Sequence, residues 1–199
     1  MLLPHEEPVS VSTEQMDNAD RLATSATADF QDKADIEIEV LLSFPELLRI
    51  SAHEYADRGW AVFPLAAGTK LPHAGSRGFL DATLDHERID SWWNERPNAN
   101  IGIATGLSSG LWVLDVDPKN GGDVTFATLV AEHGFPTGLG YVLTPSGGRH
   151  YYFRRPEGLS WPSSKERLGP GLDVRADGGY VVAPPSVIAN EGQYVEVRS

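Results

Sequence analysis

The sequence of 199 residues contains no cysteine. Disulfides, thiolate catalysis and cysteine-bound zinc are therefore excluded. No apolar run approaches the ~20 residues that a membrane-spanning helix needs. The N-terminus, MLLPHEEPVS, lacks the basic start and the apolar stretch of a signal peptide. These absences predict a cytoplasmic protein without a membrane partner, while a hydrophobic fraction of 41% is sufficient for a globular core.

Positive charge is also scarce, since the net charge is −12, but the acidity is unevenly distributed. Residues 1–47 carry 11 acids against Arg21 and Lys33, whereas residues 48–199 carry 17 acids against 14 bases. The polar N-terminal stretch, with Phe30 as its only aromatic residue, is typical of a segment that cannot bury enough apolar surface to order itself. A helix around residues 13–33 is the alternative. We predict an acidic, disordered tail over 1–42 and one folded domain over 43–199.

The folded part contains both helical and extended patterns. Ser43 and Glu46 have the spacing of a capping box, and the helix that follows is expected to end at Gly59. Further helices are expected at 85–95, with Ile89, Trp92 and Trp93 facing inward, and around 124–133. Strands are expected at 60–65, 100–104, 111–116, 141–144, 150–153, 172–175, 180–183 and 194–197. Because the helices are scattered among the strands, we predict an α+β fold with a mixed β-sheet and flanking helices.

The strand at 111–116 ends in two aspartates, Asp115 and Asp117. Side chains alternate along a strand, so the two carboxylates share a face with their Cβ atoms roughly 6–7 Å apart. Trp112, Leu114 and Val116 are expected to face the core. Two anions this close repel each other unless a cation lies between them, and oxygen ligands suit Mg²⁺ or Mn²⁺. The alternative is a simple turn signal, because aspartate favours turns.

The segment TPSGGRHYYF predicts a hairpin whose turn contains two glycines. Ser146, Gly147 and Gly148 permit a tight turn, and we expect its backbone N–H groups to stay open to an anion. Arg149 and His150 follow directly and can bind phosphate oxygens. The alternative is an ordinary hairpin with a surface histidine.

A third aspartate, Asp173, also lies in an apolar strand, and Arg175 shares its face two residues later. A third carboxylate beside the first two would complete a site for two cations. Alternatively, Asp173 only pairs with Arg175 as a structural bridge. Asp177, in the ADGG turn, is interpreted as a turn residue.

These three motifs, in this order, resemble the bifunctional primase-polymerase domain of plasmid and phage replication proteins, within the archaeo-eukaryotic primase superfamily. The pattern is a hydrophobic strand ending in DxD (114–117), small-x-His (148–150) and hydrophobic-Asp (172–173). The flanking segments YADRGWAVFPL, GTKLP, WWNERPNANIGIATG and GGYVVAPPS agree with it. The resemblance covers about residues 45–197.

The resemblance implies an RRM-like catalytic core fused to a small N-terminal αβ unit, with the active site on the exposed face of the sheet. Such a domain joins NTPs or dNTPs on a single-stranded DNA template. Asp115, Asp117 and Asp173 would hold two Mg²⁺ or Mn²⁺ ions, and His150 would contact the triphosphate. Further nucleotide contacts are expected from Ser146, Gly148, Arg149, Arg175 and, in the GTKLP loop, Lys70. A replicative helicase would have to act in trans or come from a missing C-terminal region.

Template DNA should contact basic and aromatic side chains. The candidates are Arg77, Arg154, Arg155, Trp161, Lys165 and Arg167, most of them in the loop RRPEGLSWPSSKERLGP. The alternative is a solvated surface loop.

Two other functions remain open at this point: a catalytically idle nucleotide- or DNA-binding module, and a metal-dependent nuclease. A carboxylate cluster without a function would destabilise the protein, which favours an active enzyme.

Overall fold

The structure is a computed structural model that describes residues 42–197. The chain from Ser43 onward forms one compact unit. The expectations for residues 1–41, a disordered acidic tail or a helix around 13–33, lie outside the described residues. Within residues 42–197 no helix has both the length and the apolar character that crossing a membrane requires.

Three α-helices form where the sequence predicts them. Helix α2 (Phe44–Asp57) begins at the capping box, in which the backbone N–H and the hydroxyl of Ser43 donate to Glu46 at 3.0 and 2.6 Å. Helix α3 (His86–Glu95) begins at Asp85, whose carboxylate accepts the N–H of Glu87. Helix α4 spans Gly122–His133, and short 3₁₀ helices η1 and η2 span Gly78–Asp81 and Pro118–Asn120. In α3 Ile89 and Trp93 are buried, whereas Trp92 is only partly buried against the core.

The strands form three sheets, and all seven pairings between the described strands are antiparallel. The first sheet has the order β1-β2-β7, the second β10-β4-β5-β3-β6 and the third β8-β9. The strands are β1 (Val62–Leu65), β2 (Asn100–Ala104), β3 (Leu111–Val116), β4 (Gly140–Leu143), β5 (Arg149–Arg154), β6 (Leu172–Arg175), β7 (Tyr180–Ala183), β8 (Val187–Ile188), β9 (Gly192–Gln193) and β10 (Val195–Val197). The predicted α+β class is confirmed, but separate antiparallel sheets replace the expected mixed sheet.

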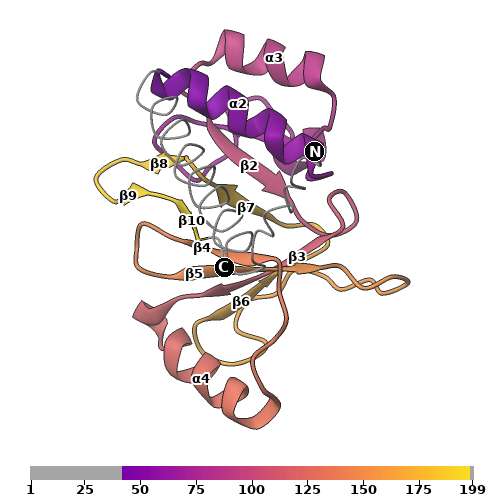
Figure 1. Ribbon diagram of the computed structural model, residues 1–199, viewed down its shortest axis with the longest axis vertical. Coiled ribbons are helices and arrows are strands. Elements are labelled where there is room, and N and C mark those ends of the chain that lie inside the picture. Colours follow the sequence, from indigo (N-terminus) through magenta and orange to yellow (C-terminus); the bar gives the residue numbers. More distant parts are fainter. Residues whose placement is uncertain (1–41, 198–199) are drawn as a thin grey trace, which may run out of the picture. The chain divides into compact units, whose positions relative to one another are not determined.

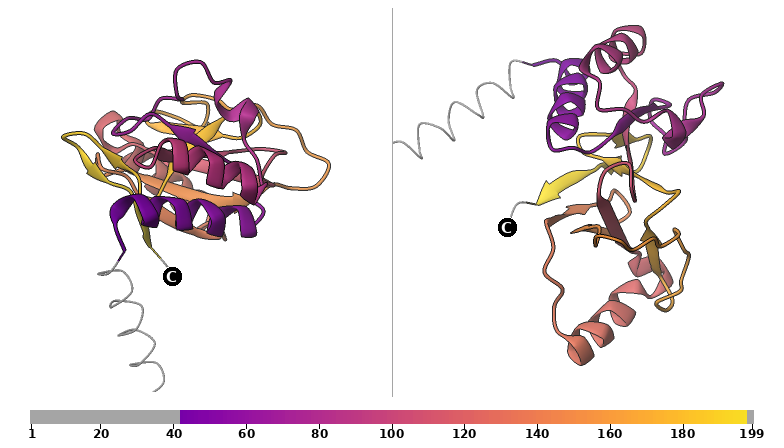
Figure 2. Two further views of the ribbon diagram at one scale, coloured as in Figure 1. Left: turned by 90° about the horizontal axis from the view of Figure 1, so that it is seen from above. Right: turned by 90° about the vertical axis from the view of Figure 1, so that its right-hand side faces the viewer.

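The two larger sheets lie between helices. Helices α2 and α3 lie side by side next to the three-stranded sheet, and α4 lies beyond the five-stranded sheet at the other end of the domain (Figures 1 and 2). One core cluster joins the two sheets, since Phe63 and Ile101 of the first belong to it together with Leu111, Val113 and Tyr152 of the second. The five-stranded sheet therefore has one face against the main core and the other toward α4.

Within residues 42–197 the chain crosses between the two larger sheets three times, and two of these crossings are neighbours. Residues 105–110 lead from β2 to β3, and residues 176–179 lead from β6 to β7. The two crossings are bonded to each other, because Thr105 donates its N–H to the carbonyl of Gly179 at 3.0 Å and its hydroxyl to that of Ala176 at 2.6 Å. These bonds hold the two sheets together beside the N-terminal end of β3.

The facing of β3 differs from the prediction. Leu111 and Val113 are 0% and 1% exposed in the main core, while Trp112 and Leu114 are only partly buried. The expectation that Trp112, Leu114 and Val116 form the core face is therefore wrong, although Val116 is itself buried. The physical reason is that both faces of this sheet are covered, so apolar side chains of β3 point to both faces and do not mark which one is the core.

Candidate active site

Three of the predicted site residues form a row across the five-stranded sheet. Asp115 on β3 is the direct register partner of His150 on β5 and of Asp173 on β6. Directly opposed residues of antiparallel strands share a face, with Cβ atoms about 4.5–5.5 Å apart. An imidazole and two carboxylates, from segments 35 and 58 positions beyond Asp115 in the sequence, therefore lie side by side.

The row lies at the edge of the core rather than on an open sheet face. Asp115 follows Leu111 and Val113 on the same, core-facing side of β3, and its side chain is 25% exposed. The expectation of a site on the exposed face of the sheet is therefore corrected. The acids lie where the packing between the two sheets ends and a cleft begins.

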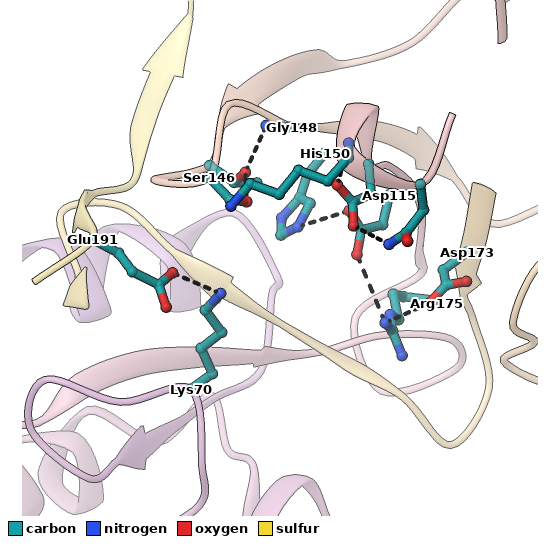
Figure 3. A network of polar contacts seen from close by, with 12 residues as sticks. Lys70, Asp115, Ser146, Gly148, His150, Asp173, Arg175 and Glu191 are labelled. Carbon is teal, nitrogen blue, oxygen red and sulfur yellow. Dashed lines mark hydrogen bonds and ion pairs between the residues drawn. The ribbon is translucent and has the colours of Figure 1, made fainter. Parts of the chain in front are cut away.

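Arg175 is the closest cation to this row. Its Nη2 atom lies 2.9 Å from Oδ2 of Asp173 and 3.7 Å from Oδ2 of Asp115, as Figure 3 shows. Asp173 also accepts the backbone N–H of Glu166 at 3.1 Å. The ion pair between Asp173 and Arg175, which was the alternative interpretation of this sequence, is thus present in the structure. Its Asp173 is at the same time a member of the carboxylate row.

Asp117 combines the two interpretations of the DxD pattern. Its carboxylate accepts the N–H of Lys119 at 3.0 Å and the side-chain amide of Asn120 at 2.7 Å, so it caps the turn η2 that ends β3. Asp117 and Asn120 also line the cleft together with Asp115. The turn therefore fixes the direction of this carboxylate without removing it from the site.

The electrostatics of Asp115 are unfavourable to a bare anion. Burial raises the pKa of its carboxyl group, the Arg175 guanidinium opposes this shift, and the charges of Asp173 and Asp117 raise the pKa further. A carboxylate that is desolvated beside two other acids requires a positive charge close by. Arg175 supplies part of that charge in the structure.

His150 is buried and uncharged at neutral pH. Desolvation lowers the pKa of its imidazole to about 3, with smaller contributions from the positive charges of Arg175 and Lys70. Its Nε2 atom lies 3.5 Å from Oδ1 of Asp115, which is therefore a contact between a neutral ring and a carboxylate rather than an ion pair. Among the described residues, its buried Nδ1 atom has no hydrogen-bond partner. A neutral imidazole here can donate one N–H to a ligand oxygen.

The glycine-containing turn between β4 and β5 is closed by its own hydrogen bonds. Gly147 donates its N–H to the carbonyl of Thr144 at 3.0 Å, and Gly148 donates to the hydroxyl of Thr144 at 3.0 Å. The prediction that the N–H groups of this turn stay open to an anion is therefore wrong for Gly147 and Gly148, because Thr144 accepts both. The Ser146 side chain, hydrogen-bonded to the same threonine hydroxyl at 3.1 Å, still lines the cleft.

Arg149 is not brought to the cleft. It pairs in register with Val116 and Leu143, on the opposite face of β5 from His150, and it is not among the described residues that line the cleft. Alternation along the strand separates the two neighbours that the sequence placed together. Its predicted contact with the nucleotide has no support in this geometry.

The cleft consists of two adjoining cavities of about 250 and 290 Å³. They share Asp115, His150, Arg175, Lys70 and Tyr194 in their walls, so they lie next to each other. Their combined size falls in the range of roughly 300–1,000 Å³ that small-molecule sites occupy. The residues come from both large sheets and from the connections between them, which is why the site depends on the tertiary fold.

Lys70 and Tyr194 reach the cleft from outside the carboxylate row. Lys70 was predicted, and its Nζ atom pairs with Oε2 of Glu191 at 3.1 Å on the side opposite Arg175 (Figure 3). Tyr194 was not predicted, although its buried ring lies 5.8 Å from that of His150 and its burial raises its pKa well above the usual value. No local pattern marks Tyr194, because only the sheet order, in which β10 pairs with β4 and β4 with β5, brings its segment near His150.

The predicted DNA contacts do not form one surface. Arg77 lies on the loop before η1 and pairs with Asp81 at 2.7 Å. Arg155 is only 15% exposed beside Asp177, with 3.5 Å between its Nε and the carboxylate, and so is held inside the protein. Arg154 is exposed at the end of β5, opposite Leu111, far along β3 from the carboxylate row.

Three other candidates do lie on one loop near the cleft. Lys165 lines the cleft itself. Arg167 lies over the ring of Trp161, with 4.8 Å from its guanidinium carbon to the ring centroid, and Trp161 packs at a tilt against Trp112 at 6.3 Å. A partly exposed aromatic ring with a cation on it is the type of surface on which an unpaired base can stack.

The donor set of the cleft fits a hard divalent cation. Within residues 42–197 no three histidine or acidic side chains form a preformed metal-ligand cluster. However, Asp115 and Asp173 are direct register partners, and Asp117 is close enough to raise the pKa of Asp115. The guanidinium of Arg175 already balances part of the negative charge of these acids. Carboxylate oxygens that need a positive charge are the ligands that Mg²⁺ and Mn²⁺ take.

The fold and this cleft define an α+β domain suited to phosphate chemistry. Residues 52–199 match a family model described as the N-terminal domain of bifunctional DNA primase/polymerase. The chain therefore belongs to the Prim-Pol family, as its motifs indicated, and its general function is of the DNA primase/polymerase type. No curated protein matches the chain significantly.

Proposed function

We propose that this chain catalyses template-directed nucleotidyl transfer, in which a 3′-hydroxyl attacks the α-phosphate of a nucleoside triphosphate and pyrophosphate leaves. The observation that carries the proposal is the register row of His150, Asp115 and Asp173 in a cleft of a Prim-Pol domain. Asp115, Asp117 and Asp173 would hold two Mg²⁺ or Mn²⁺ ions. When bound, such ions activate the hydroxyl and stabilise the charge that develops on the phosphates.

The side chains around the acids then have separate tasks. His150, uncharged and buried, donates an N–H to a phosphate oxygen without bringing an additional charge into the cleft. Lys70 and Arg175, on opposite sides of the cleft, offer positive charge to the triphosphate. The Ser146 hydroxyl offers a further donor. Together these groups orient the α-phosphate toward the acid-lined end of the space.

The template strand is assigned to the loop between β5 and β6. Trp161, with Arg167 over its ring, provides a stacking surface, and Lys165 connects that surface to the cleft. Arg77 and Arg155 are left out of this proposal because neither is among the described residues that line the cleft, and each is paired with an acid elsewhere. In replication of the plasmid, phage or prophage type, strand separation would be supplied by a helicase acting in trans or by a further part of the protein.

The test is incorporation of nucleotides on a single-stranded DNA template with NTPs or dNTPs and Mn²⁺ or Mg²⁺, followed on a denaturing gel. We expect synthesis by the wild type and a loss of at least about 100-fold in Asp115→Asn, since removal of a ligand should exceed the 10- to 100-fold effects of outer-shell changes. Asp123→Asn, which removes an exposed acid from the first turn of α4, is the matched control and should stay active.

The same assay separates the alternative functions. Shortening of the template would identify a nuclease, and absence of any reaction with bound nucleotide would identify an idle binding module. Equal rates of synthesis for the wild type and Asp115→Asn would refute the assigned site even if the protein is a polymerase.

A further inference from the structure

Two carboxylates in the cleft face each other in a geometry that is unfavourable by itself. Asp115 and Asp173 are direct register partners, with side chains only 25% and 18% exposed. Like charges directly opposite on neighbouring strands destabilise a sheet, and partial burial removes much of the water that would screen them. A positive charge at this point is therefore part of the stability of the domain, whether or not a ligand is bound.

Arg175 provides this charge from a neighbouring row of the sheet. Its register partner is Val113, two residues before Asp115, so its side chain leans along the strands to reach both acids. It donates to Asp173 at 2.9 Å and lies 3.7 Å from Asp115. Figure 3 shows the guanidinium on one side of the cleft, with dashed lines to both carboxylates. The guanidinium thus occupies the position where a shared cation would neutralise both acids.

A second cation of the cleft is held in the same way. Lys70 pairs with Glu191 at 3.1 Å, while its ammonium group also borders the space next to His150. Arg175 and Lys70, the two cations that we assign to the triphosphate, therefore both have acids as partners in the ligand-free protein. Binding of phosphate requires that these ion pairs exchange partners.

We propose that Arg175 is an internal counter-cation, which a divalent ion displaces from Asp115 and Asp173 and which then turns to the phosphates of the nucleotide. This inference rests on the proposed function, because it assigns the order of events at the same site. Divalent cation binding removes the acids from Arg175 and frees a guanidinium whose fork geometry suits phosphate oxygens. Binding of the metal and binding of the triphosphate thereby favour each other through one side chain.

The first measurement is Mn²⁺ affinity without nucleotide, read from the electron paramagnetic resonance signal of free Mn²⁺. We expect Arg175→Gln to bind Mn²⁺ about tenfold more tightly than the wild type, a change that corresponds to about 1.4 kcal/mol of removed competition. Arg175→Lys should lie between the two, because an ammonium group keeps the charge but loses the fork. Arg88→Gln, which removes an exposed arginine from α3, controls for the change in net charge and should bind like the wild type.

The second measurement is the coupling between metal and nucleotide, obtained by calorimetric titration of a non-hydrolysable nucleoside triphosphate with and without Mn²⁺. Mn²⁺ should increase the nucleotide affinity of the wild type by a larger factor than that of Arg175→Gln. In EDTA, Arg175→Gln should unfold at a lower temperature than the wild type, and Mn²⁺ should restore its stability. A merely structural bridge would not produce tighter metal binding when it is removed.

The outcomes distinguish the inference from the proposed function. If neither the wild type nor any variant binds Mn²⁺, the metal site and the inference both fail. If the wild type binds Mn²⁺ and Arg175→Gln binds it equally or more weakly, only the displacement is overturned and the metal site stands. If Arg175→Gln does not fold even with Mn²⁺, Arg175→Lys decides, and an affinity equal to that of the wild type contradicts the proposal.

Discussion

His150 has an environment very different from that of a histidine in water. It lies on β5, where its side chain is only 6% exposed and faces the carboxylate of Asp115. The positive charges of Arg175 and Lys70 also act on it. Burial, with the positive charges of Arg175 and Lys70, lowers the pKa of the ring, so the ring stays neutral. A neutral donor has an advantage in a cleft that already holds several acids and bases, because its hydrogen bond does not depend on the charge balance around it.

We expect His150→Gln to raise the apparent KM for the nucleotide by about tenfold or more, the effect of losing a hydrogen bond to a charged group. The maximal rate should change less than KM, because the acids that we propose as metal ligands are intact. Steady-state kinetics on a primed template provide the measurement. An unchanged KM would remove His150 from the triphosphate site, and Mn²⁺ binding equal to that of the wild type would show that the cleft has kept its structure.

Strand β3, which carries Asp115, shows how far the local sequence determines an element. The bounds of β3 were predicted correctly because Gly110, at φ +58°, precedes it and Pro118 follows it. Its facing was not predictable, since α4 covers one side and the main core the other. The two-residue strands β8 and β9 were missed because they are too short for an alternating pattern.

Site residues could be predicted where the pattern of their own strand marks them, and not where the tertiary fold brings them to the site from several elements. Asp115, Asp117, Asp173 and His150 each end or begin an apolar strand, so each stood out locally. Tyr194 has no such signal, because its position in the cleft follows only from the sheet order. The same limit explains why the closure of the turn by Thr144 was not foreseen, since an unpaired and a bonded N–H group look alike in a sequence.

The connections between the two sheets depend on Asp177, which was interpreted correctly as a turn residue. Its carboxylate accepts the hydroxyl of Ser160 at 2.8 Å and the N–H groups of Trp161 and Leu107, each at 3.1 Å. It thus joins three segments: the loop after β5, the connection from β2 to β3 and its own turn. Arg155, with little exposure, lies beside it.

We expect Asp177→Ala to lower the free energy of unfolding at pH 7 by about 1 kcal/mol, the net effect of these hydrogen bonds at a partly exposed site. The pKa of Asp177 is lowered in the folded state, chiefly by the Ser160 hydrogen bond and then by that from the N–H of Trp161. The difference from the wild type should therefore be fully present above about pH 4, the range of an unfolded aspartate, and disappear as the pH falls through the lowered pKa.

Urea denaturation of both proteins at a series of pH values measures this difference, and limited proteolysis of residues 156–164 reports the local effect. Asp177→Asn, which keeps an acceptor oxygen, should lose less stability than Asp177→Ala. A difference that stays constant down to pH 3 would show that the carboxylate charge is not responsible.

The charge of the whole chain opposes its proposed partner. Residues 48–199 are close to neutral in total, with 17 acids against 14 bases, and their basic side chains near the cleft are few. Binding of a single DNA strand by so few cations should be weak and should weaken further with added salt. A primase of this composition would depend on stacking and on metal-bound nucleotide for much of its hold on the template.

The N-terminal residues add a further electrostatic effect, which can be tested independently of their structure. Residues 1–41 hold ten acids against Arg21 and Lys33, and they are covalently attached to the domain that we propose binds single-stranded DNA. A tethered negative charge repels DNA and competes with it for basic side chains. We therefore expect deletion of residues 1–41 to tighten binding of a labelled single-stranded oligonucleotide several-fold at low salt, as measured by fluorescence anisotropy.

The salt dependence decides whether charge is the cause. The difference between the full chain and the deletion should shrink as salt is raised from about 50 to about 200 mM, because added salt screens the charges of residues 1–41 from the DNA. A full-length variant with the acids of residues 1–41 changed to their amides should behave like the deletion, and a scrambled segment of unchanged composition should behave like the wild type. Equal affinities of the full chain and the deletion at low salt would dismiss the effect and leave DNA binding to the domain alone.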